Sequence, residues 1–327
     1  MKIASLVKQT WIPIIILVLI SLPFWAGDYI LHVSIITFIT IIYCSTWRQN
    51  LISGDFSFGH NAWIGIGAYA AALLGLNLGL SFWVSLPLGG IAALIVAVIF
   101  GYATLRVRGM YWSVLSWAFG EVMVAIYTRF MVPFGGAGGL SSIPRPTVPF
   151  FPEFVDSKIF WYFLVLVLML VILLALYALE KSRFGRTLTL IAENDSLARS
   201  LGVNVLNYKV VNLAISSFFA AIAGGIFAYY VTAISPLVFN VLLVFLIVIY
   251  AAVGGRNHFM GPIIGVTVLM VLTQGLLETG AIRSMLLGGI LIVCQLFLPE
   301  GLVSLPKTIK GWFDKRKSKG VADASSA

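Results

Sequence analysis

Long apolar runs, separated by short polar segments, make up most of this chain of 327 residues. A helix that crosses the hydrocarbon core of a bilayer needs about 20 mostly apolar residues. By this measure the pattern predicts ten helical spans, at residues 9–25, 29–47, 62–80, 82–105, 110–132, 159–179, 210–230, 239–253, 261–277 and 284–298. The first, eighth and tenth are short, and short or interrupted spans are typical of helices that break or fail to cross. We therefore predict 8–10 transmembrane helices.

The composition excludes an ordinary soluble protein. Only 10% of the residues are charged and 60% are hydrophobic, whereas a soluble domain carries about 25% charged residues. The alternating ten-residue segments of a membrane β-barrel are absent from the pattern. The sequence thus predicts an all-α, polytopic membrane protein. Residues 1–306 form a single transmembrane domain with a cytoplasmic loop at 180–209, and residues 307–327 form a basic, disordered tail.

The placement of the basic residues orients the predicted spans. The formal net charge is +9, but the lysines and arginines flank the apolar runs, which favours a lipid surface over nucleic acid. If the N-terminus is cytoplasmic and ten spans alternate, all but four of the 21 Lys and Arg residues fall on the cytoplasmic side. The four exceptions are Arg129, Arg145, Lys158 and Arg283. The positive-inside rule therefore predicts that both termini are cytoplasmic.

No catalytic or metal-binding motif stands in the chain. The segment Gly301–Thr308, GLVSLPKT, approaches a phosphate-binding loop, but Pro306 replaces the second glycine and has no N–H to donate to a phosphate. Cys44 and Cys294 lie inside apolar runs, where cysteine acts as a small hydrophobe. We predict no catalytic residue, no metal and no cofactor bound by this chain. Energy for any transport must come from another subunit or from an ion gradient.

Four polar residues, one inside a predicted span and three just before another, are candidates for a transport path. Glu121 lies near the middle of the fifth span, where a charge costs about 2.5–3.5 kcal/mol, so we expect it to face the bundle interior. It would line a substrate path or make a structural hydrogen bond. Ser57, His60 and Asn61 lie in a glycine-rich segment. That composition indicates irregular or re-entrant backbone against protein or a water-filled cavity; the alternative is a plain turn followed by a glycine-rich packing face.

Several motifs together resemble one family. They are NLISGDFSFGHNAWIGIGAYAAALL (50–74), RGMYWSVLSWAFGEVMVAIYTRFMVPFGGAGGL (108–140), SRFGRTLTLIAENDSLARSLGVNVLNYKV (182–210), ISPLVFNVLLVFLIVIYAAVGGRNHFMGPIIG (234–265) and LPEGLV (298–303). In this order and spacing they resemble the M-type permease subunit of branched-chain amino-acid ABC importers. Two spellings depart from the family pattern, GGAGGL at 135–140 and VGGRNHFMGP at 253–262. They leave the substrate and the local backbone geometry open.

The resemblance implies the fold of an ABC importer permease in a bacterial plasma (inner) membrane, and a non-catalytic subunit. It also implies four kinds of partner: a second homologous permease, two cytoplasmic ATP-binding subunits that bind the ATP, an external substrate-binding protein and the lipid bilayer. The family includes permeases for urea and short amides, which are the alternative substrates. A proton-coupled secondary transporter that uses Glu121 as its carrier, and a membrane enzyme, are the alternatives from other classes.

A polar segment, AENDSLARSLGVNV at residues 192–205, interrupts the apolar pattern. Asn194 or Asp195 is suited to cap a helix N-terminus, and Gly202 is suited to end it. Leu197, Ala198 and Leu201 are expected on one face. Such a helix has about two turns and is too short to be stable alone, so it needs a partner surface.

The resemblance implies that this segment couples the permease to its ATPase. The residues concerned are Glu193, Asn194, Asp195, Leu197, Ala198, Leu201 and Gly202. The alternative is an ordinary amphipathic loop. Either Leu197 and Leu201 or Ser196 and Arg199 would form the contact face.

Overall fold

A computed structural model describes residues 19–107, 109–146, 157–275, 288–289 and 301–304. Eight of the predicted spans fall in these ranges, and each is a helix. They are α2 (Asp28–Leu51), α3 (His60–Leu78), α4 (Phe82–Thr104), α5 (Met110–Arg129), α7 (Lys158–Lys181), α10 (Val205–Val231), α11 (Val241–Gly254) and α12 (Gly261–Gly275). Most of the predicted span 9–25, all but two residues of 284–298 and the whole tail 307–327 lie outside the described residues.

The lengths of the helices confirm a polytopic membrane protein. Among the described residues, five helices are long and apolar enough to cross a membrane: α2, α3, α4, α7 and α10. A sixth span forms if α5 is counted with residues 131–138, which turn away from it by 103°. These residues include α6 (Met131–Phe134) and η1 (Gly136–Gly138). α11 and α12 are apolar but have only 14 and 15 residues.

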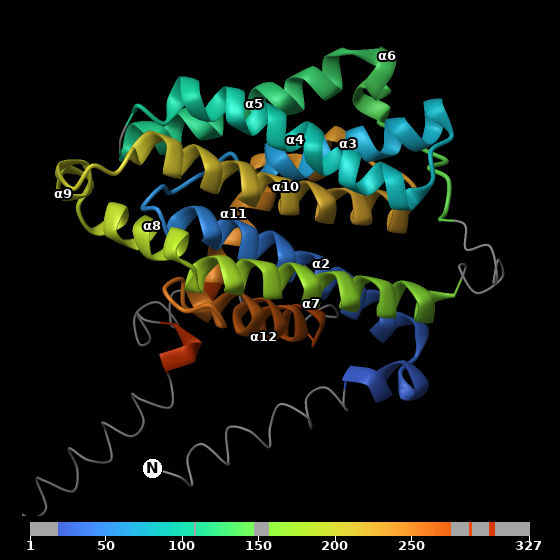
Figure 1. The fold of residues 1–327 in the computed structure, drawn as a ribbon. Coiled ribbons are helices and arrows are strands. Elements are labelled where there is room, and N and C mark those ends of the chain that lie inside the picture. Colours follow the sequence, from blue (N-terminus) through green and yellow to red (C-terminus); the bar gives the residue numbers. More distant parts are fainter. Residues whose placement is uncertain (1–18, 108, 147–156, 276–287, 290–300, 305–327) are drawn as a thin grey trace, which may run out of the picture.

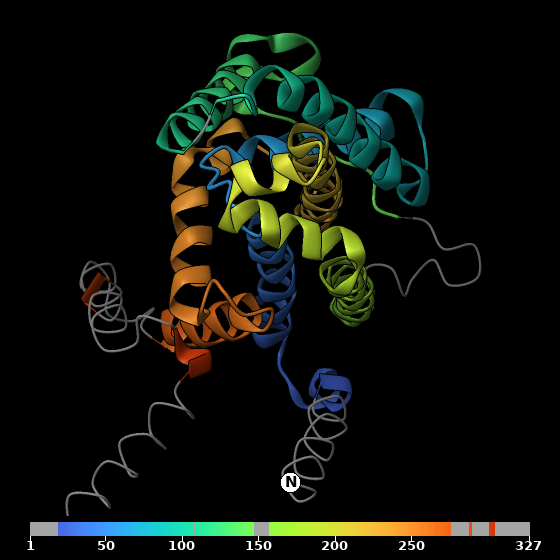
Figure 2. The same cartoon turned by 60° about the vertical axis from the view of Figure 1, so that its left-hand side comes forward.

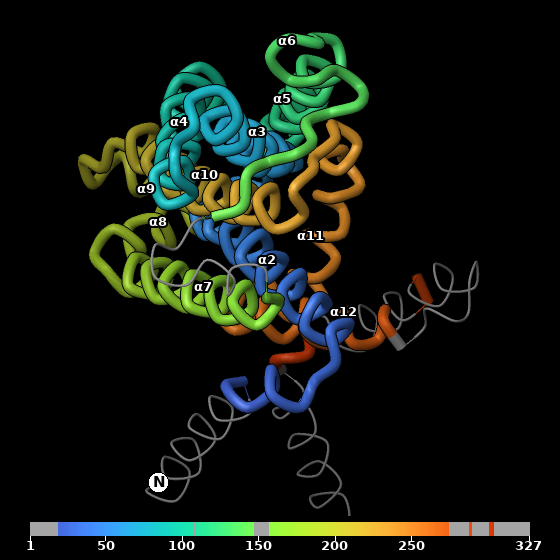
Figure 3. Tube along the Cα trace, turned by 90° about the vertical axis from the view of Figure 1, so that its right-hand side faces the viewer, coloured from blue at the N-terminus to red at the C-terminus, as the bar shows by residue number. Residues whose placement is uncertain are grey.

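Helix α2 lies at the centre of the bundle. It contacts α7, α10, α11 and α12, and every residue from Ile41 to Asn50 is buried. On one side of α2 and α10 lie α3, α4 and α5, and on the other side lie α7 and α12 (Figure 1). α11 crosses between these two sides, from the neighbourhood of α5 to that of α12 (Figures 2 and 3). A helix that is apolar around most of its circumference is typical of such a central position.

Glycines allow α10 to approach α3 at backbone distance. A Cβ added at Gly67 would lie 2.1 Å from the carbonyl oxygen of Ala221, and one added at Gly224 would lie 2.1 Å from that of Ile64. Apolar attraction between helices is weak in lipid, so small residues that permit close van der Waals contact stabilise the pair. The glycine-rich packing face that we left open for this part of the sequence is therefore present on α3.

Short elements close the two ends of the bundle. At one end, α7 is followed by α8 (Arg183–Glu193) and α9 (Asp195–Ser200), which lead back into α10; α9 is at the left of Figure 1. We call this end the α9 end. At the other end, Leu140 and Ile234 exchange two backbone hydrogen bonds, both of 2.8 Å. They tie the segment after α5 to the segment before η3 (Pro236–Phe239).

The contact between α3 and α10 gives a first prediction. Gly67→Leu and Gly224→Leu should each prevent stable folding, because backbone cannot yield as a side chain does. Overpacking already costs about 1–3 kcal/mol where neighbours can shift. The measurement is thermal unfolding, with size-exclusion profiles, of detergent-solubilised protein. Gly138→Ala is the control, since no atom lies within 4 Å of a Cβ there. Wild-type stability of Gly67→Leu would contradict the proposed backbone contact.

Candidate functional site

The segment between α7 and α10 folds as two short helices. The hydroxyl of Ser182 accepts a hydrogen bond of 3.3 Å from the backbone N–H of Gly185 and so caps α8. On α8, Gly185, Leu188 and Ile191 are buried, whereas Arg183 and Arg186 are polar and face away from this stripe. α8 is therefore amphipathic, as expected for a helix that lies along the end of the bundle.

α9 has the predicted caps. The Oδ1 atom of Asn194 accepts from the backbone N–H of Leu197 at 2.9 Å. At the other end Gly202 has a φ of +80°, and the N–H of Val203 donates to the carbonyl of Ala198 at 3.1 Å. This is the hydrogen bond of a glycine-terminated helix. Of the two predicted capping residues, Asn194 makes the bond, and Asp195 is the first residue of the helix.

The faces of α9 differ from the prediction. We expected Leu197, Ala198 and Leu201 to share one face, but Ala198 is fully buried against Ile191 and Val205. Leu197 and Leu201 are 48% and 66% exposed. Ala198 follows Leu197 by about 100° around the helix, and the chain turns back under it to begin α10. The small side chain of Ala198 thus packs α9 against α8 and α10, and Leu197 and Leu201 form an exposed apolar pair.

Ser57, His60 and Asn61 lie together and are buried. Their exposed fractions are 2%, 0% and 1%. The Nε2 atom of His60 lies 3.0 Å from Thr46 Oγ1, and the Nδ2 atom of Asn61 donates to the carbonyl of Phe239 at 2.8 Å. Residues 52–59 are irregular backbone, and α3 begins at His60. The irregular entry is therefore present as an eight-residue connection that is packed against protein.

Glu121 does not face the bundle interior. It is exposed on α5, on the same stripe as Trp117 and Val114, which are 46% and 60% exposed. The expectation of an inward-facing carboxylate was wrong because the inner face of α5 is filled by Ser113, Ser116 and other small or aromatic residues. The sequence pattern places Glu121 near the middle of a membrane span, but it does not determine which way the side chain points.

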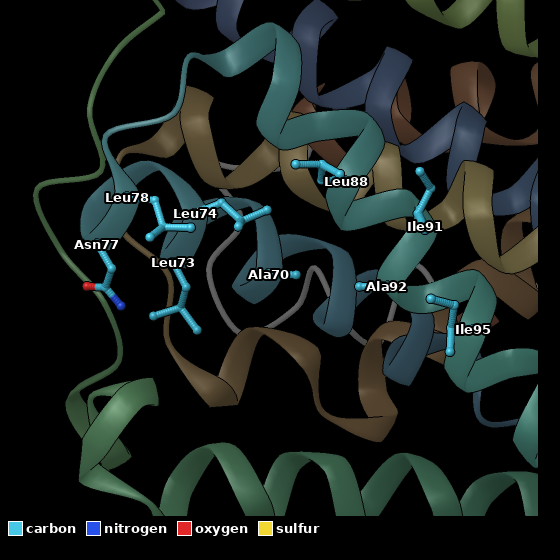
Figure 4. Close-up of a pocket in the computed structure, with 9 residues that line it drawn as sticks. All are labelled: Ala70, Leu73, Leu74, Asn77, Leu78, Leu88, Ile91, Ala92 and Ile95. Atoms are coloured by element: carbon cyan, nitrogen blue, oxygen red, sulfur yellow. The ribbon is translucent and has the colours of Figure 1, made fainter.

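The structure has two apolar cavities near these elements. One, of about 610 Å³, is an open groove between α3 and α4, lined by aliphatic side chains with Asn77 as its one polar side chain (Figure 4). The other, of about 540 Å³, lies where residues 54–58, the start of α5 and the start of α11 meet. Its lining residues are Gly54, Phe56, Phe58, Gly109, Met110, Ser113, Val114, Trp117, Val241 and Phe245. We call it the aromatic cavity.

Sequence reasoning missed the aromatic cavity. Its aromatic side chains come from three separated segments, at Phe56 and Phe58, at Trp117 and at Phe245. The signal was the aromatic pair in GDFSFG, whose residues lie outside any predicted span.

The described residues also hold no group of three His, Cys, Asp or Glu side chains that could bind a metal ion.

Comparison with known proteins decides the family. Residues 29–295 match the family model described as the branched-chain amino acid transport system / permease component. The chain belongs to this family. It is therefore a permease component of a branched-chain amino acid transport system.

Individual relatives agree with this assignment. The permease is 27% identical over 326 residues to the high-affinity branched-chain amino acid transport system permease protein LivM of Escherichia coli (strain K12), covering 93% of this chain and 77% of that protein. LivM of Salmonella typhimurium gives the same identity and coverage. The permease is also 26% identical over 242 residues to a probable branched-chain amino acid transport permease protein LivH of Methanocaldococcus jannaschii, covering 69% of this chain and 71% of that protein. No solved structure matches it.

A buried ion pair anchors the start of α10 in the permease. The Nζ atom of Lys209 lies 2.7 Å from Asp55, and their side chains are 14% and 13% exposed. Ser53 also donates to Asp55, at 2.8 Å. Burial raises the pKa of the Asp55 carboxyl, while the Lys209 ammonium acts in the opposite direction. The pair connects α10 to the irregular segment before α3.

A second ion pair joins three elements at the same end. The guanidinium of Arg48 donates to both carboxylate oxygens of Glu180, at 2.8 and 3.1 Å. It also donates through Nε to the carbonyl of Arg256, at 3.1 Å. α2, the end of α7 and the connection between α11 and α12 are thereby linked. A bidentate pair of this kind fixes geometry as well as charge.

The Asp55–Lys209 pair gives a second prediction. Lys209→Met leaves an uncompensated buried carboxylate, which typically costs about 3–5 kcal/mol of unfolding free energy. Without the ammonium, the pKa of Asp55 in the folded state lies still further above its unfolded value. The penalty is therefore fully present above that folded pKa, shrinks as the pH falls through it, and disappears only below the unfolded pKa.

Denaturant unfolding of the detergent-solubilised permease over a range of pH measures this effect. The double variant Asp55→Asn, Lys209→Met should recover a large part of the loss. Lys181→Met, at an exposed lysine, is the matched control. A loss in Lys209→Met that does not depend on pH would exclude the carboxylate as its cause.

Proposed function

We propose that this permease forms half of the translocation path of an ATP-driven importer for branched-chain amino acids. The observation that carries the proposal is the exposed apolar pair on α9, in a chain that belongs to this permease family. The proposal includes a second, homologous permease, two ATP-binding subunits and an external binding protein. Similarity of this one chain to both a LivM and a LivH protein supports a pair of related permeases.

The distribution of charge supports a cytoplasmic position for the α9 end. The basic residues described at or near this end are Arg48, Arg106, Lys181, Arg183, Arg186, Arg199, Lys209 and Arg256. Those at the opposite end are Arg129, Arg145 and Lys158. Lysine and arginine are in excess on the cytoplasmic side of membrane proteins. The proposed orientation therefore directs α9 towards ATP-binding subunits in the cytoplasm.

In this proposal α9 receives the movement of the ATPase. Leu197 and Leu201 insert into the partner surface, and Glu193 and Asp195 lie at its rim. Asn194 and Gly202 hold the helix ends, while Ala198 transmits the displacement to α8 and α10. The geometry supports this division, because the leucines are exposed and Ala198 is buried. A helix of six residues is too short to be stable alone, so it requires such a partner surface to keep its shape when the ATPase moves against it.

The proposed path runs along the exposed face of α5. A carboxylate in the middle of a membrane span is costly against lipid. Glu121 therefore supports a position for this face against the second permease, with a hydrated path between the two. Ser57, His60 and Asn61 support this path indirectly, because they hold residues 52–59 against α2 and η3. Closure of the ATPase would move this wall of the path and open it to the cytoplasm.

Reconstitution tests the proposed function directly. The permease is combined with its second permease, ATP-binding subunits and binding protein in proteoliposomes. Uptake of leucine, isoleucine and valine should require ATP inside the vesicle and be absent with urea as the solute. Uptake by this chain alone, driven by a proton gradient, would replace the proposal with a secondary transporter. Uptake of urea would assign the other substrate class of the family.

The role of α9 gives a third prediction. The double variant Leu197→Ser, Leu201→Ser removes the exposed apolar pair and leaves the caps intact. We expect recovery of the ATP-binding subunits with the purified permease to fall by about 10-fold or more, because a few buried apolar anchors carry most of an interface's energy. Val107→Ser, at an exposed valine of the same end, should have no effect. Full recovery of the ATP-binding subunits with the double variant would contradict a docking role for the leucines.

A further inference from the structure

The aromatic cavity and Glu121 lie on the same face of α5. Met110, Val114 and Trp117 line the cavity, and Glu121 follows Trp117 by four residues. Residues four apart lie above one another on a helix, separated by about 6 Å along its axis. The carboxylate is therefore one turn beyond the apolar wall of the cavity, towards the opposite end of the bundle.

The cavity has a rigid wall. The hydroxyl of Ser113 donates to the carbonyl of Phe56 at 2.7 Å, and the N–H of Phe58 donates to Ser116 Oγ at 3.0 Å. From α2, the indole N–H of Trp47 donates to the carbonyl of Ser57 at 2.8 Å. These bonds lock the irregular segment to α5 and α2. A site held in this way binds without first having to order its own residues.

The aromatic side chains of the wall form a continuous chain. Ring centroids lie 5.2 Å apart between Trp47 and Phe56, 4.9 Å between Phe56 and Phe58, and 5.7 Å between Phe58 and Phe245. The first three rings come from α2 and residues 52–59, and the last comes from α11. The volume of about 540 Å³ is in the range of small-molecule sites. This surface favours an aliphatic group.

We propose that the aromatic cavity and Glu121 form a subsite for the transported amino acid. The cavity takes the branched aliphatic side chain, and the Glu121 carboxylate pairs with the α-ammonium group. The combination of one carboxylate with an apolar cavity matches the α-ammonium group and the hydrocarbon branch of such an amino acid, whose own carboxylate then points away from Glu121 into the hydrated path. The inference rests on the proposed function and adds where the substrate is held in the path.

The first test compares Glu121→Gln with Glu121→Asp in the reconstituted complex. A charge-assisted hydrogen bond to the substrate is worth about a 10-fold to 100-fold change in rate. We expect leucine import by Glu121→Gln to fall by that factor, with partial rescue in Glu121→Asp. ATPase stimulation by the loaded binding protein should persist in both variants. Persistent ATPase activity without import distinguishes a substrate contact from a contact that holds the subunits together.

The second test probes the cavity. Trp117→Ala and Phe245→Ala enlarge it, so import of leucine should fall more than import of valine, whose side chain makes less contact. Leu115→Ala is the control, because Leu115 is exposed on α5 and does not line the cavity. Equal losses for the two substrates would overturn a side-chain subsite.

Two further outcomes would overturn the proposal. One is wild-type leucine import by Glu121→Gln. The other is joint loss of import, ATPase stimulation and the second permease, which would make this face a subunit interface. Failure of the wild-type complex to import any branched-chain amino acid would instead overturn the proposed function itself. Import by the wild-type complex therefore separates the hypothesis of a substrate subsite from the hypothesis of branched-chain amino acid import.

Discussion

Pairing of the polar side chains at the end of α2 is the constraint on which the rest of the structure depends. Arg48 and Gln49 are buried in the centre of a bundle, and unpaired buried polar groups destabilise a fold strongly. Arg48 pairs with Glu180, and Gln49 donates to Asn212 at 3.0 Å. Because these partners come from α7 and α10, the two helices are held in fixed register with α2. These hydrogen bonds lie at the α9 end of the bundle.

This network connects the surface at α9 to the aromatic cavity. Val205 packs under Ala198 at the start of α10, and Lys209, one turn further along, pairs with Asp55. Asp55 precedes Phe56 directly, so the acidic partner of the ion pair and part of the cavity wall belong to the same eight-residue segment. These contacts form a continuous connection between neighbours from α9 to the wall of the aromatic cavity.

The features predicted from the sequence are those that depend on local pattern. Apolar runs are sufficient to find the helices α2, α3, α4, α5, α7, α10, α11 and α12, and the caps of α9 follow from Asn194 and Gly202. The directions of Ala198 and Glu121 were wrong because each depends on which helix packs behind it. The ion pairs Arg48–Glu180 and Lys209–Asp55 join residues 132 and 154 positions apart. No spacing along the chain indicates such pairs, and the aromatic cavity was missed for the same reason.

The close approach of α3 and α10 restricts how the permease changes shape. With backbone against backbone at Gly67 and Gly224, the two helices have no side-chain layer through which to slide. They behave as a single rigid block, to which α4 is added by its own contacts with both. A change of shape in the permease therefore has to move α3, α4 and α10 together, because none of them can slide along its neighbour.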